Sequence, residues 1–116
     1  MKTALACLIV SASLVGASAA SSMSTATLKG TVGPGFTISL TKGGKKVKSL
    51  KAGKYTFKIA DKSNIHNFAL KGPVKKTLTG VSFTGNKTVT IKLKKGKYTY
   101  YCTPHATIMK GSFTVK

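Results

Sequence analysis

The chain is built from short segments in which apolar and polar residues alternate, and glycine-containing turns separate these segments. The alternation is clearest in residues 36–40, 55–59 and 89–93. A period of two places apolar side chains on one face of an extended strand and polar side chains on the other. No window has the period of an amphipathic helix, and shorter candidate strands lie at residues 27–32, 47–50, 65–70, 81–84, 98–102 and 112–115. We therefore predict an all-β fold, an antiparallel Greek-key β-sandwich of about eight strands.

The first twenty residues predict a cleaved secretory signal peptide. A basic residue, Lys2, precedes an apolar run over residues 4–15, and an A-x-A cleavage signal follows at residues 17–19. The run is shorter than the roughly 20 apolar residues that a membrane-spanning helix needs. We therefore expect cleavage after Ala19 or Ala20 and a secreted or periplasmic protein.

The remainder of the chain has room for one small domain. We expect a small-residue N-terminal tail over residues 21–30 and a single domain over residues 31–116. The tail begins with serine, methionine and threonine residues and contains no alternating segment before residue 27.

Charge is the second strong constraint. The chain has a net charge of +19, all twenty basic residues are lysines, and the only carboxylate side chain is Asp61. Catalysis by paired carboxylates is therefore excluded, and a carboxylate cage for calcium or magnesium is disfavoured. We expect no enzymatic activity.

Cleavage of the signal peptide would remove Cys7 and leave Cys102 as the only thiol. A lone cysteine cannot form an intramolecular disulfide, even in an oxidising compartment that favours one. A free thiol is also open to oxidation there. Two interpretations follow from this count: Cys102 is a buried, small apolar residue, or it is a thiolate bound to a metal.

The sequence near the C-terminus gathers further metal ligands around this thiol. Cys102, His105 and Met109 lie within eight residues, and the only other histidine is His66. Two imidazoles, one thiolate and a weak axial thioether are the ligand set of a blue-copper electron-transfer site. We therefore predict a metal site built from His66, Cys102, His105 and Met109.

These motifs resemble those of the cupredoxins, the small blue copper proteins of the plastocyanin, pseudoazurin and amicyanin type. The resemblance rests on His66-Asn67 and on Cys102-Thr103-Pro104-His105 followed by Met109, and it extends over about residues 31–116. It implies one copper ion per chain that cycles between Cu(II) and Cu(I). His66, Cys102 and His105 would be the strong equatorial ligands, and Met109 the long axial ligand. Asn67 and Thr103 would tie the two ligand segments together.

The ligand loop has a length of its own. Three residues separate His105 from Met109 here, whereas plastocyanin-type loops have four and amicyanin-type loops have two.

Other interpretations of these residues stay open: zinc also accepts two histidines and a cysteine, and Cys102 with His105 could form a nucleophile pair. Each residue, taken alone, could also be a core residue.

The lysines indicate an anionic partner. They lie mostly at turns and at outward strand positions, where they also hinder aggregation through strand edges. A field of one sign attracts acidic partners, so we expect an acidic redox protein as partner, a monomeric state and no specific recognition of nucleic acid, because the chain has no arginine. We expect the protein to carry single electrons. The alternatives are a copper-delivery module and a basic β-sandwich that binds anionic envelope polymers.

Overall fold

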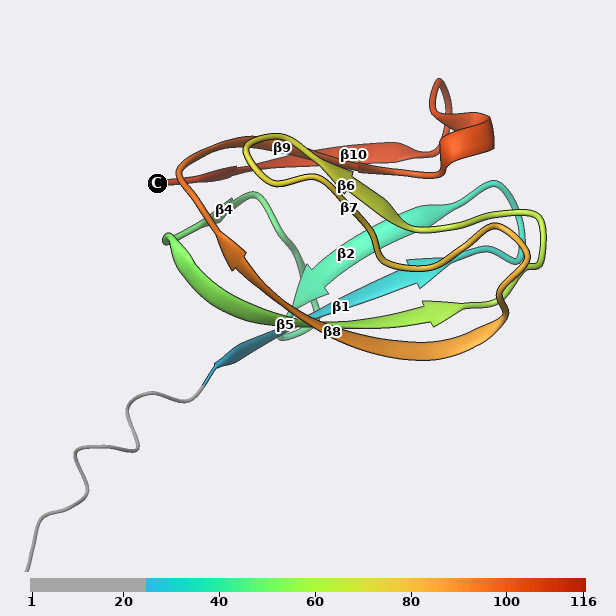
Figure 1. The fold of residues 1–116 in the computed structure, drawn as a ribbon, viewed down its shortest axis with the longest axis horizontal. Coiled ribbons are helices and arrows are strands. Elements are labelled where there is room, and N and C mark those ends of the chain that lie inside the picture. Colours follow the sequence, from blue (N-terminus) through green and yellow to red (C-terminus); the bar gives the residue numbers. More distant parts are fainter. Residues whose placement is uncertain (1–24) are drawn as a thin grey trace, which may run out of the picture.

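The computed structural model describes residues 25–116 as two five-stranded sheets packed face to face (Figure 1). The first sheet has the order β3-β2-β1-β5-β8 and the second has the order β4-β10-β9-β6-β7. The strands are β1 Ala26–Val32, β2 Ile38–Lys42, β3 Lys45–Lys46, β4 Ser49–Leu50, β5 Gly53–Asp61, β6 Ala69–Lys71, β7 Lys76–Thr77, β8 Gly85–Leu93, β9 Gly96–Tyr101 and β10 Lys110–Val115. The all-β sandwich that the alternating segments predict is thus confirmed.

The predicted signal peptide, residues 1–20, lies outside the described residues, as does the start of the predicted tail up to residue 24. Strand β1 begins at Ala26, so residues 26–30, which the sequence placed in the tail, belong to the sandwich. Across the described range, no helix has the length and apolar character that a membrane span requires.

The core forms between the sheets from the apolar faces of the strands. In β5, Tyr55, Phe57 and Ile59 are buried, while Lys54 and Lys58 are exposed. The same alternation buries Tyr98 and Tyr100 of β9. Because buried residues alternate with exposed or half-buried ones in β5 and β9, each of these strands presents one apolar face to the other sheet.

Several expectations about individual strands are wrong. The sheets are mixed, because β1 pairs with β5 and β4 pairs with β10 in parallel. Residues 81–84 and 65–68 are turns and loops, so the apolar alternation there does not mark strands. Phe36 lies before β2 and is 58% exposed, although its alternation with Ile38 assigned it to the core.

Aromatic side chains pack beneath the end of the sandwich that carries the ligand loop. The rings of Phe68 and Tyr100 stack with centroids 5.6 Å apart, and those of Tyr98 and Phe113 stack at 5.2 Å. Tyr100 lies opposite Gly111 in the register of β9 and β10, where the glycine leaves room for the ring. Burial raises the pKa of the Tyr100 hydroxyl. This packing fixes the two strands from which the ligand loop extends.

Candidate metal centre

Three side chains predicted as ligands converge at one end of the sandwich. His66 comes from the loop between β5 and β6, Cys102 directly follows β9, and His105 ends the short 3₁₀ helix η2, Thr103–His105. Figure 1 shows the ligand loop between β9 and β10 beside the turns that join β1 to β2 and β5 to β6. The ligand atoms of His66, Cys102 and His105 all lie within 4.8 Å of one another.

The separations of these atoms fit one metal ion. The Sγ atom of Cys102 lies 3.7 Å from Nδ1 of His66 and 3.5 Å from Nδ1 of His105, and the two nitrogens are 3.1 Å apart. An ion with zinc-like bond lengths of about 2.0–2.3 Å, centred in a triangle of ligands, requires separations of about 3.5–4.0 Å. Both sulfur–nitrogen distances fall in this range, and the nitrogen–nitrogen distance is slightly shorter.

Backbone hydrogen bonds hold the ligand loop in shape. The N–H of Cys102 donates to the carbonyl of Met109 at 3.0 Å, and the N–H of Met109 donates to the carbonyl of His105 at 2.8 Å. The N–H of His105 in turn donates to the carbonyl of Cys102 at 3.1 Å. Met109 is 1% exposed. The backbones of the three loop residues are therefore mutually fixed, and the Met109 side chain is shielded from solvent.

Asn67 connects the two ligand segments, as the resemblance implied. Its Oδ1 atom accepts a hydrogen bond from the backbone N–H of Thr103 at 2.7 Å and another from the Thr103 hydroxyl at 3.2 Å. Asn67 follows His66 and Thr103 follows Cys102, so one amide group links two ligand positions. Asn67 is itself 1% exposed, and partners beyond the direct ligands hold a metal site in its geometry.

Two of the three clustered side chains are buried, and the third, His105, reaches solvent. Cys102 and His66 are buried, whereas His105 is partly exposed. Phe36 lies against both imidazoles, with ring centroids 5.1 Å from His66 and 4.9 Å from His105. The alternation of Phe36 with Ile38 did not predict this contact with the imidazoles. The turn at residues 33–35, directly before Phe36, was the sequence feature that could have shown that Phe36 lies outside the strand.

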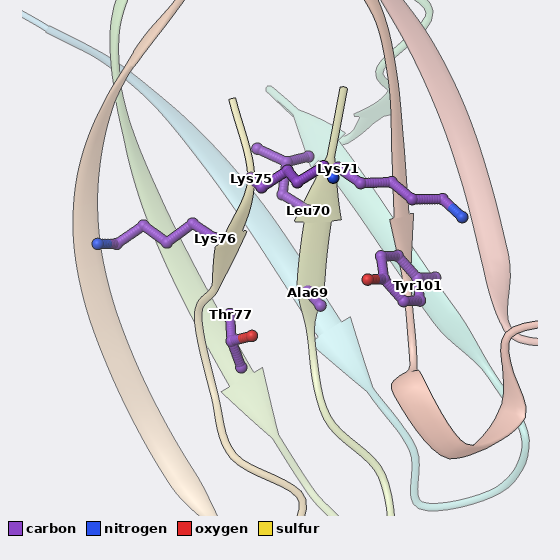
Figure 2. Close-up of a pocket in the computed structure, with 7 residues that line it drawn as sticks. All are labelled: Ala69, Leu70, Lys71, Lys75, Lys76, Thr77 and Tyr101. Carbon is purple, nitrogen blue, oxygen red and sulfur yellow. The ribbon is translucent and has the colours of Figure 1, made fainter. Parts of the chain in front are cut away.

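A basic cavity lies on the outer face of the second sheet, beside β9, the strand that ends directly before Cys102. It has a volume of about 320 Å³. Three lysines, a threonine, an aromatic ring and two aliphatic residues line it (Figure 2): Lys71, Lys75, Lys76, Thr77, Tyr101, Ala69 and Leu70. The Nζ atom of Lys71 lies 4.8 Å from the centroid of the Tyr101 ring. Tyr101 directly precedes Cys102 in the chain, so the cavity includes the residue next to the thiol.

Two imidazoles and one thiol at the end of a β-sandwich define a copper-binding protein, because this donor set is typical of type 1 copper. The sequence model of the family described as copper-binding proteins of the plastocyanin/azurin family matches residues 20–116. The chain therefore belongs to this family of cupredoxins, and the cluster of His66, Cys102 and His105 fits a single type 1 copper site.

Solved structures agree with this assignment. Reduced rusticyanin is 28% identical, and the match covers 79% of this chain and 79% of that chain with a TM-score of 0.59. Auracyanin A, a blue copper protein from the green thermophilic photosynthetic bacterium Chloroflexus aurantiacus, is 18% identical. That match covers 80% of this chain and 100% of auracyanin A with a TM-score of 0.56, and it supports the fold. Among curated proteins, no sequence matches this chain.

Proposed function

We propose that this protein is an extracytoplasmic carrier of single electrons. His66, Cys102 and His105 would hold the copper as equatorial ligands, and Met109 would be the axial ligand. The observation that carries the proposal is the convergence of the three ligand atoms within 3.7 Å of one another, with the thiol at zero exposure. Copper, when bound, supplies a reversible one-electron couple.

The protein's own residues support electron transfer over chemistry on a substrate. Cys102, His66 and Met109 are buried, which limits the access of water or a substrate to these side chains. Asn67 and the loop hydrogen bonds hold the ligands in one arrangement. A site that is held rigid needs little rearrangement between the two oxidation states, which favours fast transfer.

His105 offers the route for the electron. It is the partly exposed ligand, and three exposed apolar side chains occupy the same end of the sandwich: Phe36 at 58%, Ile65 at 54% and Ile108 at 64% exposure. Exposed apolar side chains of this size mark contact surfaces. A redox partner that docks on this end would lie close to the imidazole of His105.

An acidic redox protein is the partner that the charge favours. Lys71, Lys75 and Lys76 line the cavity that also includes Tyr101, the residue before Cys102. They contribute to the net charge of +19, which would be +18 once Lys2 is removed with the signal peptide. Such a field steers an acidic protein toward productive encounters.

Salt dependence of electron transfer tests the carrier function. We expect rapid transfer to an acidic redox protein, with a bimolecular rate that falls steeply as salt rises from 0.01 to 0.15 M, because the Debye length shrinks from about 30 Å to about 8 Å. Stopped-flow mixing measures the rate, and a chelator assay on the reduced protein measures copper retention. Slow transfer at every salt concentration, with Cu(I) passed readily to the chelator, would indicate a copper-delivery module instead.

Replacing Met109 with leucine tests the axial ligand. We expect the variant to keep its copper and to show a higher reduction potential, because losing a weak axial donor destabilises Cu(II) more than Cu(I). Leucine has a similar volume, so the buried packing should be retained. Protein-film voltammetry gives the potential, and Ile108→Leu is the matched control in the same loop. An unchanged potential in Met109→Leu would show that Met109 only packs.

A further inference from the structure

The solvent face of the sheet β3-β2-β1-β5-β8 carries lysines placed directly opposite one another. Lys29 of β1 faces Lys58 of β5, and Lys54 of β5 faces Lys92 of β8. All four are exposed. Like charges at directly opposite positions destabilise a sheet. In the other sheet, the strand registers of the described residues place no lysine opposite a lysine.

No carboxylate of the chain relieves this repulsion. The only acidic side chain is Asp61, which is 1% exposed and lies on the inward side of β5. Its Oδ1 atom accepts a hydrogen bond from the backbone N–H of Ser63 at 3.2 Å. The negative charge that the paired lysines lack must therefore come from outside the protein.

Hydroxyl groups lie between the two lysine pairs. Thr27, Thr56 and Thr90 occupy facing positions on β1, β5 and β8. A strand rises about 3.3 Å per residue, so Lys54 and Lys58 lie about 13 Å apart along β5 with Thr56 between them. The face thus presents a basic pair, a row of hydroxyls and a second basic pair in sequence along the strands.

A cavity on the same face adds further donors. It has a volume of about 360 Å³, and its polar lining comprises Lys29, Lys58, Asn86, Lys87 and Thr88. Ammonium groups bind phosphate as point charges, and asparagine and threonine side chains donate hydrogen bonds to phosphate oxygens. The cavity therefore has the donor types that a phosphate group requires.

We propose that this basic face, defined by Lys29, Lys54, Lys58 and Lys92, binds a linear polymer of phosphate groups. A flexible chain can follow the twist of the sheet and reach both lysine pairs. The exposed large apolar side chains of the described residues are Phe36, Ile65, Val81 and Ile108, and none of them lies on this face. The polymer would leave the end with His105 free, so the inference goes beyond electron transfer and does not depend on it.

The test compares two variants of equal net charge. One carries four Lys→Gln substitutions on the basic face, at Lys29, Lys54, Lys58 and Lys92. The other carries four on the opposite sheet, at the exposed Lys71, Lys76, Lys97 and Lys110. Binding of copper-loaded protein to fluorescently labelled linear inorganic polyphosphate is measured by anisotropy across a salt series. The retained fold is checked by circular dichroism.

The basic-face variant should lose about a hundredfold in affinity near 0.1 M salt, and its slope of log affinity against log salt should fall by about 3. The variant of the opposite sheet should lose less than about fivefold, because only its long-range field changes. Equal losses in the two variants would overturn the proposal, since binding would then follow net charge alone. Failure of wild-type protein to bind polyphosphate at 0.1 M salt would overturn it as well.

Two further measurements are independent of that comparison. Lys58→Thr should raise the unfolding temperature at low salt, and added salt or polyphosphate should remove the gain, because the substitution relieves repulsion that anions also relieve. An unchanged or lowered unfolding temperature at low salt would contradict the stated repulsion.

Tighter binding to vesicles of equal parts phosphatidylcholine and phosphatidylglycerol than to polyphosphate, at matched phosphate concentration, would overturn the assignment of a linear polymer.

Discussion

Replacing Cys102 with serine is expected to abolish the intense blue colour of the copper-loaded, oxidised protein. The colour would arise from charge transfer between the Cys102 thiolate and Cu(II), and a hydroxyl is a harder and much less basic donor. Cys102 is also the only cysteine among the described residues, so no second thiol is at hand to replace it. Absorption spectroscopy during titration with Cu(II) measures the effect.

Loss of the fold would give the same result, so the experiment needs a control. Thr99→Ser, on the strand that directly precedes Cys102 and outside the ligand cluster, should keep the colour. Circular dichroism should show the β-sandwich in both variants, because serine is nearly the size of cysteine. A Cys102→Ser variant that binds Cu(II) with undiminished blue absorption would contradict the assignment of the thiolate.

Replacing Asn67 with alanine is expected to weaken copper binding by about 10–100-fold and to lower the free energy of unfolding by about 2 kcal/mol. The amide oxygen accepts two hydrogen bonds from Thr103, at 2.7 and 3.2 Å. Without them the loop with Cys102 and His105 loses its link to the segment with His66. Copper competition with a chelator and thermal unfolding measure the two effects.

Asn64→Ala is the matched control, because Asn64 lies in the same loop and is exposed. It should change neither copper affinity nor the free energy of unfolding by a measurable amount. If the two alanine variants behave alike, the amide of Asn67 does not organise the site. A drop in stability for Asn67→Ala with unchanged copper affinity would make the residue structural only.

The all-β fold could be predicted from the sequence because apolar and polar residues alternate clearly in β5, in β9 and in the second half of β8. Pairing partners were less accessible, since a period of two identifies a buried face and not a neighbour. The parallel pairs of β1 with β5 and of β4 with β10 join segments far apart in the chain. Alternation also misled at Phe36, where the apolar side chain covers the metal centre instead of the core.

The ligand cluster was accessible because the chain has so few candidates. With one cysteine and two histidines among the described residues, a Cys-x-x-His spacing left few alternatives. The exposed apolar residues around the site could not be predicted, since nothing in the sequence distinguishes Ile65 and Ile108 from core residues. Their exposure depends on how the loops between strands fold, and loop conformation does not follow from periodicity. The opposition of Lys29 and Lys58 likewise needed the strand register.

The absorption spectrum of the copper-loaded, oxidised wild-type protein tests the central claim most directly. A type 1 centre built from His66, Cys102 and His105 should give one intense band in the red part of the visible spectrum at one copper per chain. The band should disappear on reduction and return on reoxidation without loss of metal. A Cu(II) complex with only weak visible absorption would contradict the assignment of a blue copper protein.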